Sequence, residues 1–345
     1  MRQLALAAVA ALLAASCDGQ HLLHPNGKDQ VLMFDVGFGI LGEGLARDII
    51  LPREKTLVRA CNQTDPVCEV KTFRYDFEGT TIDVNPDPGL RLVEAPLDGR
   101  GYRLRVACDT AATDGHDELR VRVLDGTTVK YADAIDVPCR AADGMLVDVR
   151  PESLDIAEPS PPRALAAVGA SILAVGSPWA DTPEGQQSLF GLGFTVDGAG
   201  SAFAIEDAPP LGASFYLEAL APGGAGATIH AGTISAPLPI EAIPDDAWTL
   251  VLATQACSFD DATNKPASLP AVKVSVSGRT NAGEYVGVPR RGCDYTFTGS
   301  DGQVRSLPGL HCFDHCIDAV AGGQLCAMLG GKNACAIVDA NGDSH

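Results

Sequence analysis

Short runs in which apolar and polar residues alternate dominate the first half of the chain. From Tyr102 to Cys108 every second residue is apolar, and two arginines fall between them. The run Leu119–Asp125 alternates in the same way and leads into Gly126, so it ends in an Asp-Gly pair typical of tight hairpins. Successive side chains of a β-strand point to opposite faces, so this period predicts strands that are buried on one side.

The same period recurs later in the chain. The run VKVSVSG at 272–278 places three valines on one face, and no segment between 31 and 149 sustains a helical period. The chain has 37 glycines and 23 prolines, a composition typical of short strands joined by many turns. These features together predict an all-β fold with the architecture of a β-sandwich.

A proline-rich stretch, RPESLDIAEPSPPR at 150–163, predicts a domain boundary. The segments FTVDGAGSAFAI and YLEALAPGGAGATIHAGTISAPLPIEAI that follow it resemble a bacterial Ig-like domain. The resemblance implies a sandwich fold here and a role as stalk, adhesin or binding module, since such domains share a fold rather than one function. Unlike antibody-type domains, this stretch has no cysteine, and Trp179 is its one candidate core tryptophan.

The chain is accordingly predicted to contain tandem Ig-like β-sandwich domains and a small cysteine-rich C-terminal cap. We divide it into a signal peptide at 1–16, a polar tether at 17–29, an Ig-like β-sandwich at 30–149, a bacterial Ig-like domain at 150–246 and a β-rich domain at 247–345. The tail at 311–335 has four cysteines and little strand pattern. We therefore expect a disulfide-stapled cap with one helix from about Leu310 to Ala321.

The N-terminus is an apolar run that stops at a cysteine. Arg2 precedes the uncharged stretch Leu4–Ala15, the layout of a secretory signal that is too short to span a bilayer. The sequence Ala-Ala-Ser-Cys at 14–17 resembles the lipobox of bacterial lipoproteins, although that family most often has Leu at position 14. The resemblance implies that Cys17 carries acyl groups such as palmitate and anchors the chain in the cell envelope. The alternative is an ordinary cleaved signal with a coincidental cysteine.

The cysteine count supports export. Of 11 cysteines, ten remain once Cys17 is assigned to the lipid, an even number that suits disulfides in an oxidising compartment. We assign these ten to disulfides: Cys61, Cys68, Cys108, Cys139, Cys257, Cys293, Cys312, Cys316, Cys326 and Cys335.

Two pairings follow from the strand pattern. Cys108 and Cys139 each lie on the apolar face of their strand, which favours a bridge between them. Cys61 and Cys68 flank a turn-prone stretch, which favours the local bridge Cys61–Cys68. The alternative is Cys61–Cys108, which would imitate the bridge between the sheets of immunoglobulin domains. The pairing of the four tail cysteines stays open.

Charge narrows the range of partners. The chain has 44 acidic and 25 basic residues and a formal net charge of −19. This balance repels phosphate backbones, so we expect no nucleic-acid partner. The expected partners are the membrane, reached through the N-terminal lipid, and a protein or glycan ligand.

Two motifs imitate binding sites but lack an essential part. Gly37, Gly39 and Gly42 form a G-x-G-x-x-G pattern, but the stretch before Pro52 is too short for the helix that holds a pyrophosphate. We interpret the pattern as a glycine-rich strand connection.

The second motif is an EF-hand-like run at 83–94. Asp83, Asn85, Asp87 and Glu94 occupy ligand positions of a calcium loop, but Pro88 stands where that loop needs glycine. The fixed φ of proline prevents that loop from closing, so a turn between strands is predicted.

The cysteines of the tail could bind a metal ion instead of forming disulfides. Its thiols could form a zinc site from Cys312, Cys316, Cys326 and Cys335, with His311 and His315 as alternates. The spacings lack the paired C-x2-C of zinc ribbons, so disulfides are favoured.

The sequence also lacks the G-x-S-x-G pattern of a nucleophile elbow. We therefore predict an envelope binding or structural protein without catalytic activity or cofactor; the alternative is an exported hydrolase or its accessory domain.

Overall fold

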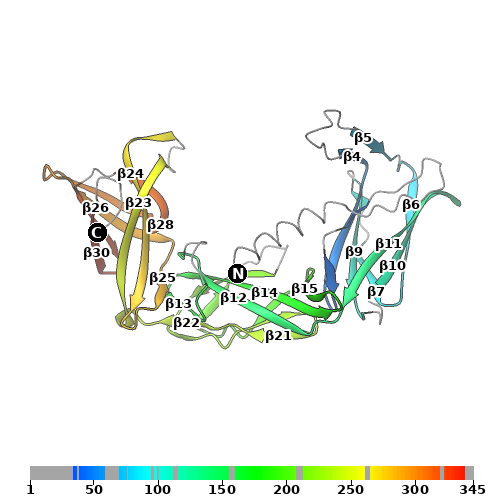
Figure 1. The fold of residues 1–345 in the computed structure, drawn as a ribbon, viewed down its shortest axis with the longest axis horizontal. Helices are drawn as coiled ribbons and strands as arrows, with labels where there is room; N and C mark the ends of the chain where they lie inside the picture. Colours follow the sequence, from blue (N-terminus) through cyan, green and yellow to red (C-terminus); the bar gives the residue numbers. More distant parts are fainter. Residues whose placement is uncertain are drawn as a thin grey trace. The chain divides into compact units, whose positions relative to one another are not determined.

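The computed structural model describes residues 34–36, 39–58, 70–75, 77–94, 97–98, 101–111, 116–154, 160–206, 213–260, 265–318 and 322–338. Across these ranges the regular elements are β-strands and one short 3-10 turn, η1 (Asp245–Ala247). The all-β prediction is confirmed (Figure 1). The signal peptide, the tether, Cys17 and the proposed Cys61–Cys68 bridge lie outside the described residues.

The chain divides into two compact units. The first comprises Met1–Met145, Ser177–Gly193 and Ala231–Ile234, and the second comprises Leu146–Gly176, Phe194–His230 and Ser235–His345. The first unit thus includes 177–193 and 231–234, two ranges that the sequence pattern predicts to belong to the middle segment. The division into three β-rich segments stays a prediction.

The first unit contains two larger sheets and a hairpin. One sheet has the order β1-β3-β9-β7, with β8 paired to β9: β1 (Asp35–Val36), β3 (Ala46–Pro52), β7 (Leu90–Glu94), β8 (Leu97–Asp98) and β9 (Gly101–Cys108). The other is part of a nine-stranded sheet and has the order β15-β2-β11-β10-β6: β2 (Ile40–Gly42), β6 (Thr80–Pro86), β10 (His116–Asp125), β11 (Thr128–Arg140) and β15 (Gly185–Phe190). Strands β4 (Glu54–Val58) and β5 (Val70–Arg74) form the hairpin, while β12 (Gly144–Pro151) and β14 (Ser171–Thr182) have residues in both units.

The core of the first unit lies between these two sheets. The apolar residues of β9, β10 and β11 alternate with polar ones as predicted, and their inward side chains are at most 6% exposed: Tyr102, Leu104, Val106, Cys108, Leu119, Val121, Val123, Ile135, Val137 and Cys139. A T-shaped contact joins the rings of Tyr102 and Phe77, whose centroids are 4.8 Å apart. The predicted hairpin is present, since Asp125 pairs with Thr128 across Gly126, which has a φ of 59°.

The second unit is built from several sheets. A seven-stranded sheet has the order β19-β22-β13-β25-β24-β23, with β28 paired to β24: β13 (Ala164–Ala167), β19 (Gly223–Gly224), β22 (Ile240–Ile243), β23 (Trp248–Asp260), β24 (Lys265–Thr280), β25 (Tyr285–Gly287) and β28 (Phe313–Asp318). A four-stranded sheet has the order β27-β26-β29-β30: β26 (Arg291–Thr298), β27 (Val304–His311), β29 (Gln324–Leu329) and β30 (Lys332–Ile337). The smaller strands of this unit are β16 (Thr195–Asp197), β17 (Phe203–Ile205) and β18 (Ser214–Ala219), while β20 (Thr228–Ala231) and β21 (Ile234–Pro237) have residues in both units.

The seven-stranded and four-stranded sheets share one apolar core, which makes this part of the second unit a β-sandwich. Val272, Val274 and Val276 of β24 are each 0% exposed, so the predicted valine face is confirmed. Tyr295 and Leu325 of the four-stranded sheet pack into the same core and are also 0% exposed.

The helix predicted from about Leu310 to Ala321 is wrong. Strand β27 runs to His311, and β28 pairs with β24 in a register that places Ile317 opposite Val272. Phe313 and Ile317 are four residues apart, a spacing that fits one face of a helix and one face of a strand equally well. Pairing with β24 decides between the two periods, and both side chains are only 4% exposed.

The rest of the tail also contains more strand than its residue pattern indicates. Strands β29 and β30 form a hairpin in which Leu329 pairs with Lys332. Gly330 and Gly331 between them have φ values of 56° and 81°. A two-residue loop with both φ values positive matches the right-handed twist of a hairpin, and glycine adopts these values without strain.

Candidate functional site

Three disulfides are described. Cys108–Cys139 joins β9 of one sheet to β11 of the other, so the predicted bridge is present and excludes the alternative Cys61–Cys108. The others are Cys293–Cys312 and Cys326–Cys335. Cys316 is also disulfide-bonded, and Cys257 lies in β23 with its side chain outside the described part.

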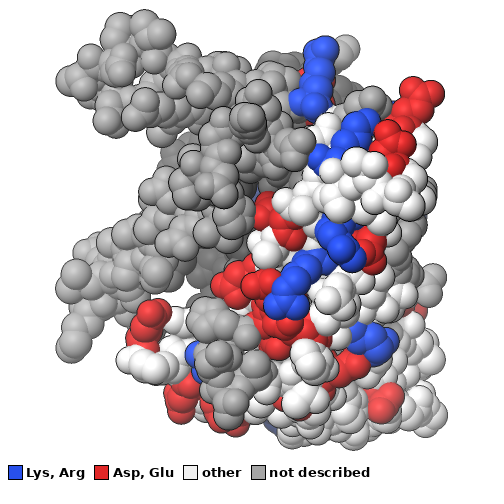
Figure 2. All heavy atoms as spheres, turned by 90° about the vertical axis from the view of Figure 1, so that its right-hand side faces the viewer, with Lys and Arg blue, Asp and Glu red and all other residues white. Residues whose placement is uncertain are grey.

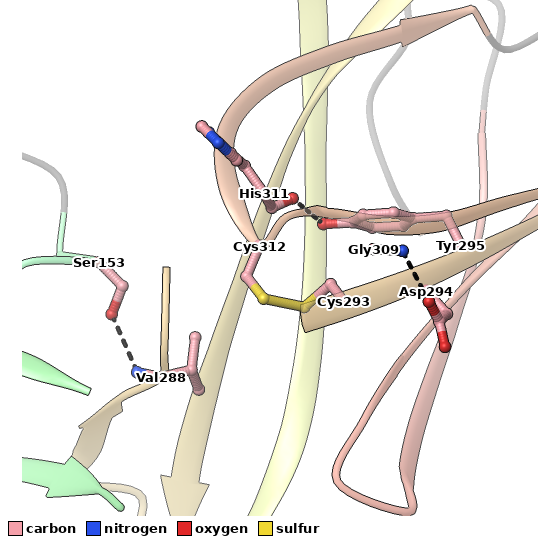
Figure 3. The surroundings of a disulfide bond; sticks show 8 residues. All are labelled: Ser153, Val288, Cys293, Asp294, Tyr295, Gly309, His311 and Cys312. Carbon is pink, nitrogen blue, oxygen red and sulfur yellow. Dashed lines mark hydrogen bonds between the residues drawn. A yellow bond between two sulfur atoms is a disulfide. The ribbon is translucent and has the colours of Figure 1, made fainter. Parts of the chain in front are cut away.

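These bridges decide whether the four cysteines of the tail could bind zinc. Cys312, Cys316, Cys326 and Cys335 are all disulfide-bonded, so none is a thiolate that could bind a metal ion. Cys312 pairs with Cys293, outside the tail, so the tail is not a separately stapled element. Figure 3 shows that bridge beside Tyr295, whose hydroxyl donates to the carbonyl oxygen of His311 at 2.9 Å.

The outer face of the first unit carries paired charges. Figure 2 shows basic and acidic side chains interleaved over one face of the molecule. Arg122 of β10 lies opposite Asp83 of β6, and its Nε donates to Asp83 Oδ2 at 3.0 Å. Arg120 contacts Glu118 Oε1 through Nε at 2.7 Å and Asp87 Oδ1 through Nη1 at 3.3 Å. Strand register places Arg122 beside Asp83, whereas Arg120 lies opposite Asn85 and reaches carboxylates along its own strand and just beyond β6.

A second group of charges lies on the other sheet of this unit. Asp48 of β3 accepts hydrogen bonds from Arg105 Nε at 2.7 Å and from Arg103 Nε at 3.0 Å, both on β9. Burial alone would raise the pKa of the Asp48 carboxyl, but the hydrogen bonds and charges of Arg105 and Arg103 outweigh it and lower that pKa. Asp48 is therefore held as a carboxylate.

Two shallow hollows adjoin Arg140, the last residue of β11. One, of about 310 Å³, is lined by Ile40, Pro138, Arg140, Thr182, Pro183, Glu184 and Gln187. The other, of about 260 Å³, is lined by Glu43, Ala111, Arg140, Ala141, Asp143, Ala180 and Asp181.

The carboxylates beside Arg140 are partly engaged within the chain. Glu43 accepts from the Ala111 amide at 3.2 Å, and Asp143 accepts from the Asp181 amide at 2.8 Å. One guanidinium thus shares these hollows with four carboxylates, contributed by Glu43, Asp143, Asp181 and Glu184. This composition suits polar or cationic groups of a ligand.

The described residues of the glycine-rich motif and of the EF-hand-like run lie in strands and turns, and Gly37 lies outside the described residues. Gly39 leads into β2, and its carbonyl oxygen accepts from Nη2 of the buried Arg47 at 2.6 Å. In the EF-hand-like run, the Leu90 amide donates to the Asp87 carbonyl at 2.9 Å, which closes the predicted turn through Pro88. Asp83 and Asp87 are ion-paired with arginines rather than directed at one point.

Among the described residues of the second unit, His230 and Asp197 form a histidine–carboxylate pair. Their Nε2 and Oδ2 atoms are 3.2 Å apart, and the side chains are 36% and 74% exposed. In the described ranges, no group of three or more His, Cys, Asp or Glu residues is arranged to hold a metal ion. No helix among the described residues is long and apolar enough to cross a bilayer.

Sequence reasoning missed Asp48 and the residues around Arg140. The alternation along β9 shows that Arg103 and Arg105 share a face, but their acceptor comes from β3, and only the pairing of these strands brings it there. The residues around Arg140 come from separate segments of the chain. No local motif marks them.

No family model and no curated protein matches the chain. Among solved structures, domains 4–9 of the surface layer protein SbsC align with 88% of this chain and 46% of that chain, at 12% identity and a TM-score of 0.27. The I-band fragment I67–I69 from titin aligns with 88% of this chain and 95% of its own, at 10% identity and a TM-score of 0.19. Mouse cadherin-23 EC22–24 aligns with 89% and 97%, at 14% identity and a TM-score of 0.17. The chain spans about half the length of the SbsC chains that it matches, and none of these likenesses defines its function.

Proposed function

We propose that the chain is a lipid-anchored protein of the bacterial cell envelope that acts as a structural and binding module rather than as an enzyme. The observation that carries the structural part is the build of the described residues, in which apolar cores lie between β-sheets and a disulfide joins the two sheets of the first unit.

The sequence supports the anchor. Leu4–Ala15 has the length and composition of a signal segment, and Cys17 follows three small residues, as in the lipobox. A diacylglyceryl group with a further acyl chain on Cys17 would hold the protein stably at a membrane. The polar residues that follow Cys17 would then link the anchor to the first unit.

The binding role is supported by the surface around Arg140. A guanidinium beside several carboxylates offers both donors and acceptors, which suits the hydroxyl groups of a glycan or the polar side chains of a protein. The charge of −19 favours partners that are neutral or basic.

The anchor is tested by mass spectrometry of the mature chain from its native envelope. We expect an N-terminal Cys17 that carries acyl mass, and recovery of the chain in the membrane fraction. As a control, residues 1–17 are replaced by an ordinary cleavable secretory signal, and this chain should be released in soluble form. An unmodified Cys17, or membrane retention of the control chain, contradicts the proposal.

The binding role is tested separately with purified envelope glycan as the probe. The soluble control chain and its Arg140→Ala variant are compared for retention on the glycan, with Arg122→Ala as a matched loss of charge elsewhere on the same unit. We expect retention to fall with Arg140→Ala alone. Equal retention of all three chains rules out this surface as a glycan site.

A further inference from the structure

The described disulfides differ sharply in their exposure. Cys108, Cys139, Cys293 and Cys312 are each 0% exposed, so both of their bridges lie inside a sandwich. Cys335, in contrast, is exposed and Cys326 is partly exposed. A thiol can attack a disulfide only if it reaches a sulfur atom, so accessibility in the folded state separates Cys326–Cys335 from the other two bridges.

The position of this bridge in its sheet favours attack on one of its two sulfurs. Cys326 of β29 and Cys335 of β30 are directly opposite each other, with their Cα atoms 4.0 Å apart. Strand β30 ends the sheet order β27-β26-β29-β30, so among the described residues no further strand of this sheet lies beyond Cys335. On the other side, Thr296 of β26 lies opposite Cys326. A thiolate must approach roughly along the S–S axis, and of the two cysteines the edge residue Cys335 is the more exposed, which favours attack on its sulfur.

The surroundings of the bridge carry little charge. We call the outer side of this sheet the sulfur face, and its residues follow from strand register: Asp294, Thr296, Thr298, Val304, Ser306, Gln324, Cys326, Met328, Asn333, Cys335 and Ile337. Asp294 is the one charged residue among them, and its Oδ1 accepts from the Gly309 amide at 2.7 Å. An incoming thiolate is an anion, so on a chain of charge −19 a nearly uncharged face is where it meets least repulsion.

We infer that Cys326–Cys335 is a thiol–disulfide exchange site whose partner is a thiol, most effectively a protein dithiol. The partner's thiolate attacks Sγ of Cys335, forms a mixed disulfide with it and releases Cys326 as a thiolate, which then takes up a proton. The partner's second thiolate attacks its own sulfur in the mixed disulfide and releases Cys335. Two electrons and two protons pass from the dithiol to the bridge, and the partner leaves as a disulfide.

Two features make the exchange reversible without loss of the fold. Strands β29 and β30 keep their full register from Gln324↔Ile337 to Leu329↔Lys332, so backbone pairing holds the two cysteines opposite each other after reduction. In addition, Sγ of Cys335 lies 3.7 Å from Oδ1 of Asn333. The bridged sulfur has no hydrogen, so this contact becomes a weak hydrogen bond only when Cys335 is a thiol.

The test uses the full chain in its folded form with limiting dithiothreitol as the probe, followed by alkylation and peptide mass spectrometry. We expect Cys326 and Cys335 to be alkylated at least about tenfold faster than the cysteines of the two buried bridges. Cys293–Cys312 is the matched internal control, because it belongs to the same unit. Equal rates for the two bridges would mean that reduction proceeds through unfolding, and this result overturns the proposal.

The direction of attack is tested with glutathione and an acid quench. The glutathione adduct is expected on Cys335; an adduct mainly on Cys326 overturns the assignment of the attacked sulfur.

The charge argument is tested with Gln324→Glu, which adds a carboxylate to the sulfur face two residues from Cys326. It should slow attack by the anionic thiolate about two- to threefold, whereas Gln324→Asn should leave the rate unchanged. A Glu variant that reacts as fast as the original chain contradicts the role of this face.

Discussion

Each unit combines a buried disulfide with a buried tyrosine hydrogen bond, but places them differently. In the first unit the bridge Cys108–Cys139 runs directly from one sheet to the other. In the second, Cys293 of β26 is bridged to Cys312, the residue between β27 and β28, where the chain passes from the four-stranded to the seven-stranded sheet. Both bridges therefore lie where the two sheets must be held together.

Each unit also contains a buried tyrosine whose hydroxyl is hydrogen-bonded. Thr80 Oγ1 donates to the Phe77 carbonyl at 2.7 Å, so the hydroxyl of Tyr102, 2.9 Å away, must donate to Thr80. The Tyr295 hydroxyl instead donates to the backbone of His311, next to Cys312. The hydrogen bonds of Tyr102 and Tyr295 show that a buried hydroxyl needs an acceptor, which can be either a side chain or the backbone.

The largest expected loss of unfolding free energy comes from removing a disulfide. Replacing Cys108 and Cys139 together by alanine should lower the free energy of unfolding by about 3–4 kcal/mol, because the bridge closes a long loop in the unfolded chain. The two cysteines are 31 residues apart, whereas Cys326 and Cys335 are 9 apart. Replacing the latter pair should therefore cost less.

Each unit has its own tryptophan for this measurement. Trp179 belongs to the first unit and Trp248 to the second. Denaturant unfolding followed by fluorescence in Trp179→Phe and Trp248→Phe backgrounds reports one unit at a time. Equal losses of unfolding free energy for the two bridges would contradict the expected dependence on loop length.

The next effect concerns a close approach of two turns inside the first unit. Gly232 has a φ of 60°, and a Cβ there would meet the carbonyl group of Glu43. Gly126 has a φ of 59° with no atom within 4 Å of its Cβ position. Both alanine variants should lose about 1–2 kcal/mol from the left-handed backbone, and Gly232→Ala about 1–3 kcal/mol more from the clash. Equal losses of unfolding free energy in denaturant titrations would rule out the close approach.

The tyrosines should give a smaller effect. Tyr295→Phe and Tyr102→Phe should each lower the free energy of unfolding by about 1 kcal/mol, the usual net contribution of one hydrogen bond. Burial raises the pKa of Tyr295, so the unfolded chain loses the tyrosine proton first as the pH rises. The corresponding stability is present below about pH 10 and is lost above it. Alkaline unfolding curves should therefore be shallower for Tyr295→Phe; identical curves contradict this account.

The smallest effect should come from the ion pairs. Asp48→Asn should cost about 0.5–1 kcal/mol at neutral pH. Because the folded pKa of Asp48 is lowered, this stabilisation is present above about pH 4 and disappears as the pH falls below it. Asp109→Asn, at an exposed pair with Arg91, is the control and should change stability little. A cost that persists at low pH would show that charge is not the cause.

Much of the fold can be predicted because it is local. The strands around Tyr102–Cys108 and Leu119–Asp125 follow from alternation alone, and that alternation also places Cys108 on a buried face. The turn through Pro88 follows from the fixed φ of proline. Chain composition and the signal-like N-terminus, by themselves, predict export and the use of cysteine in disulfides.

Strand pairing decides the rest. The spacing of Phe313 and Ile317 fits a helix as well as a strand, and β24 selects the strand by pairing with it. The partner of Cys312, the carboxylate between Arg103 and Arg105, and the hollows beside Arg140 all join segments distant in sequence. Alternation is a property of neighbouring residues, so the sequence by itself determines which face of a strand is buried. Which strand lies opposite depends on burial and hydrogen bonding summed over the whole sheet, and only the tertiary structure decides it.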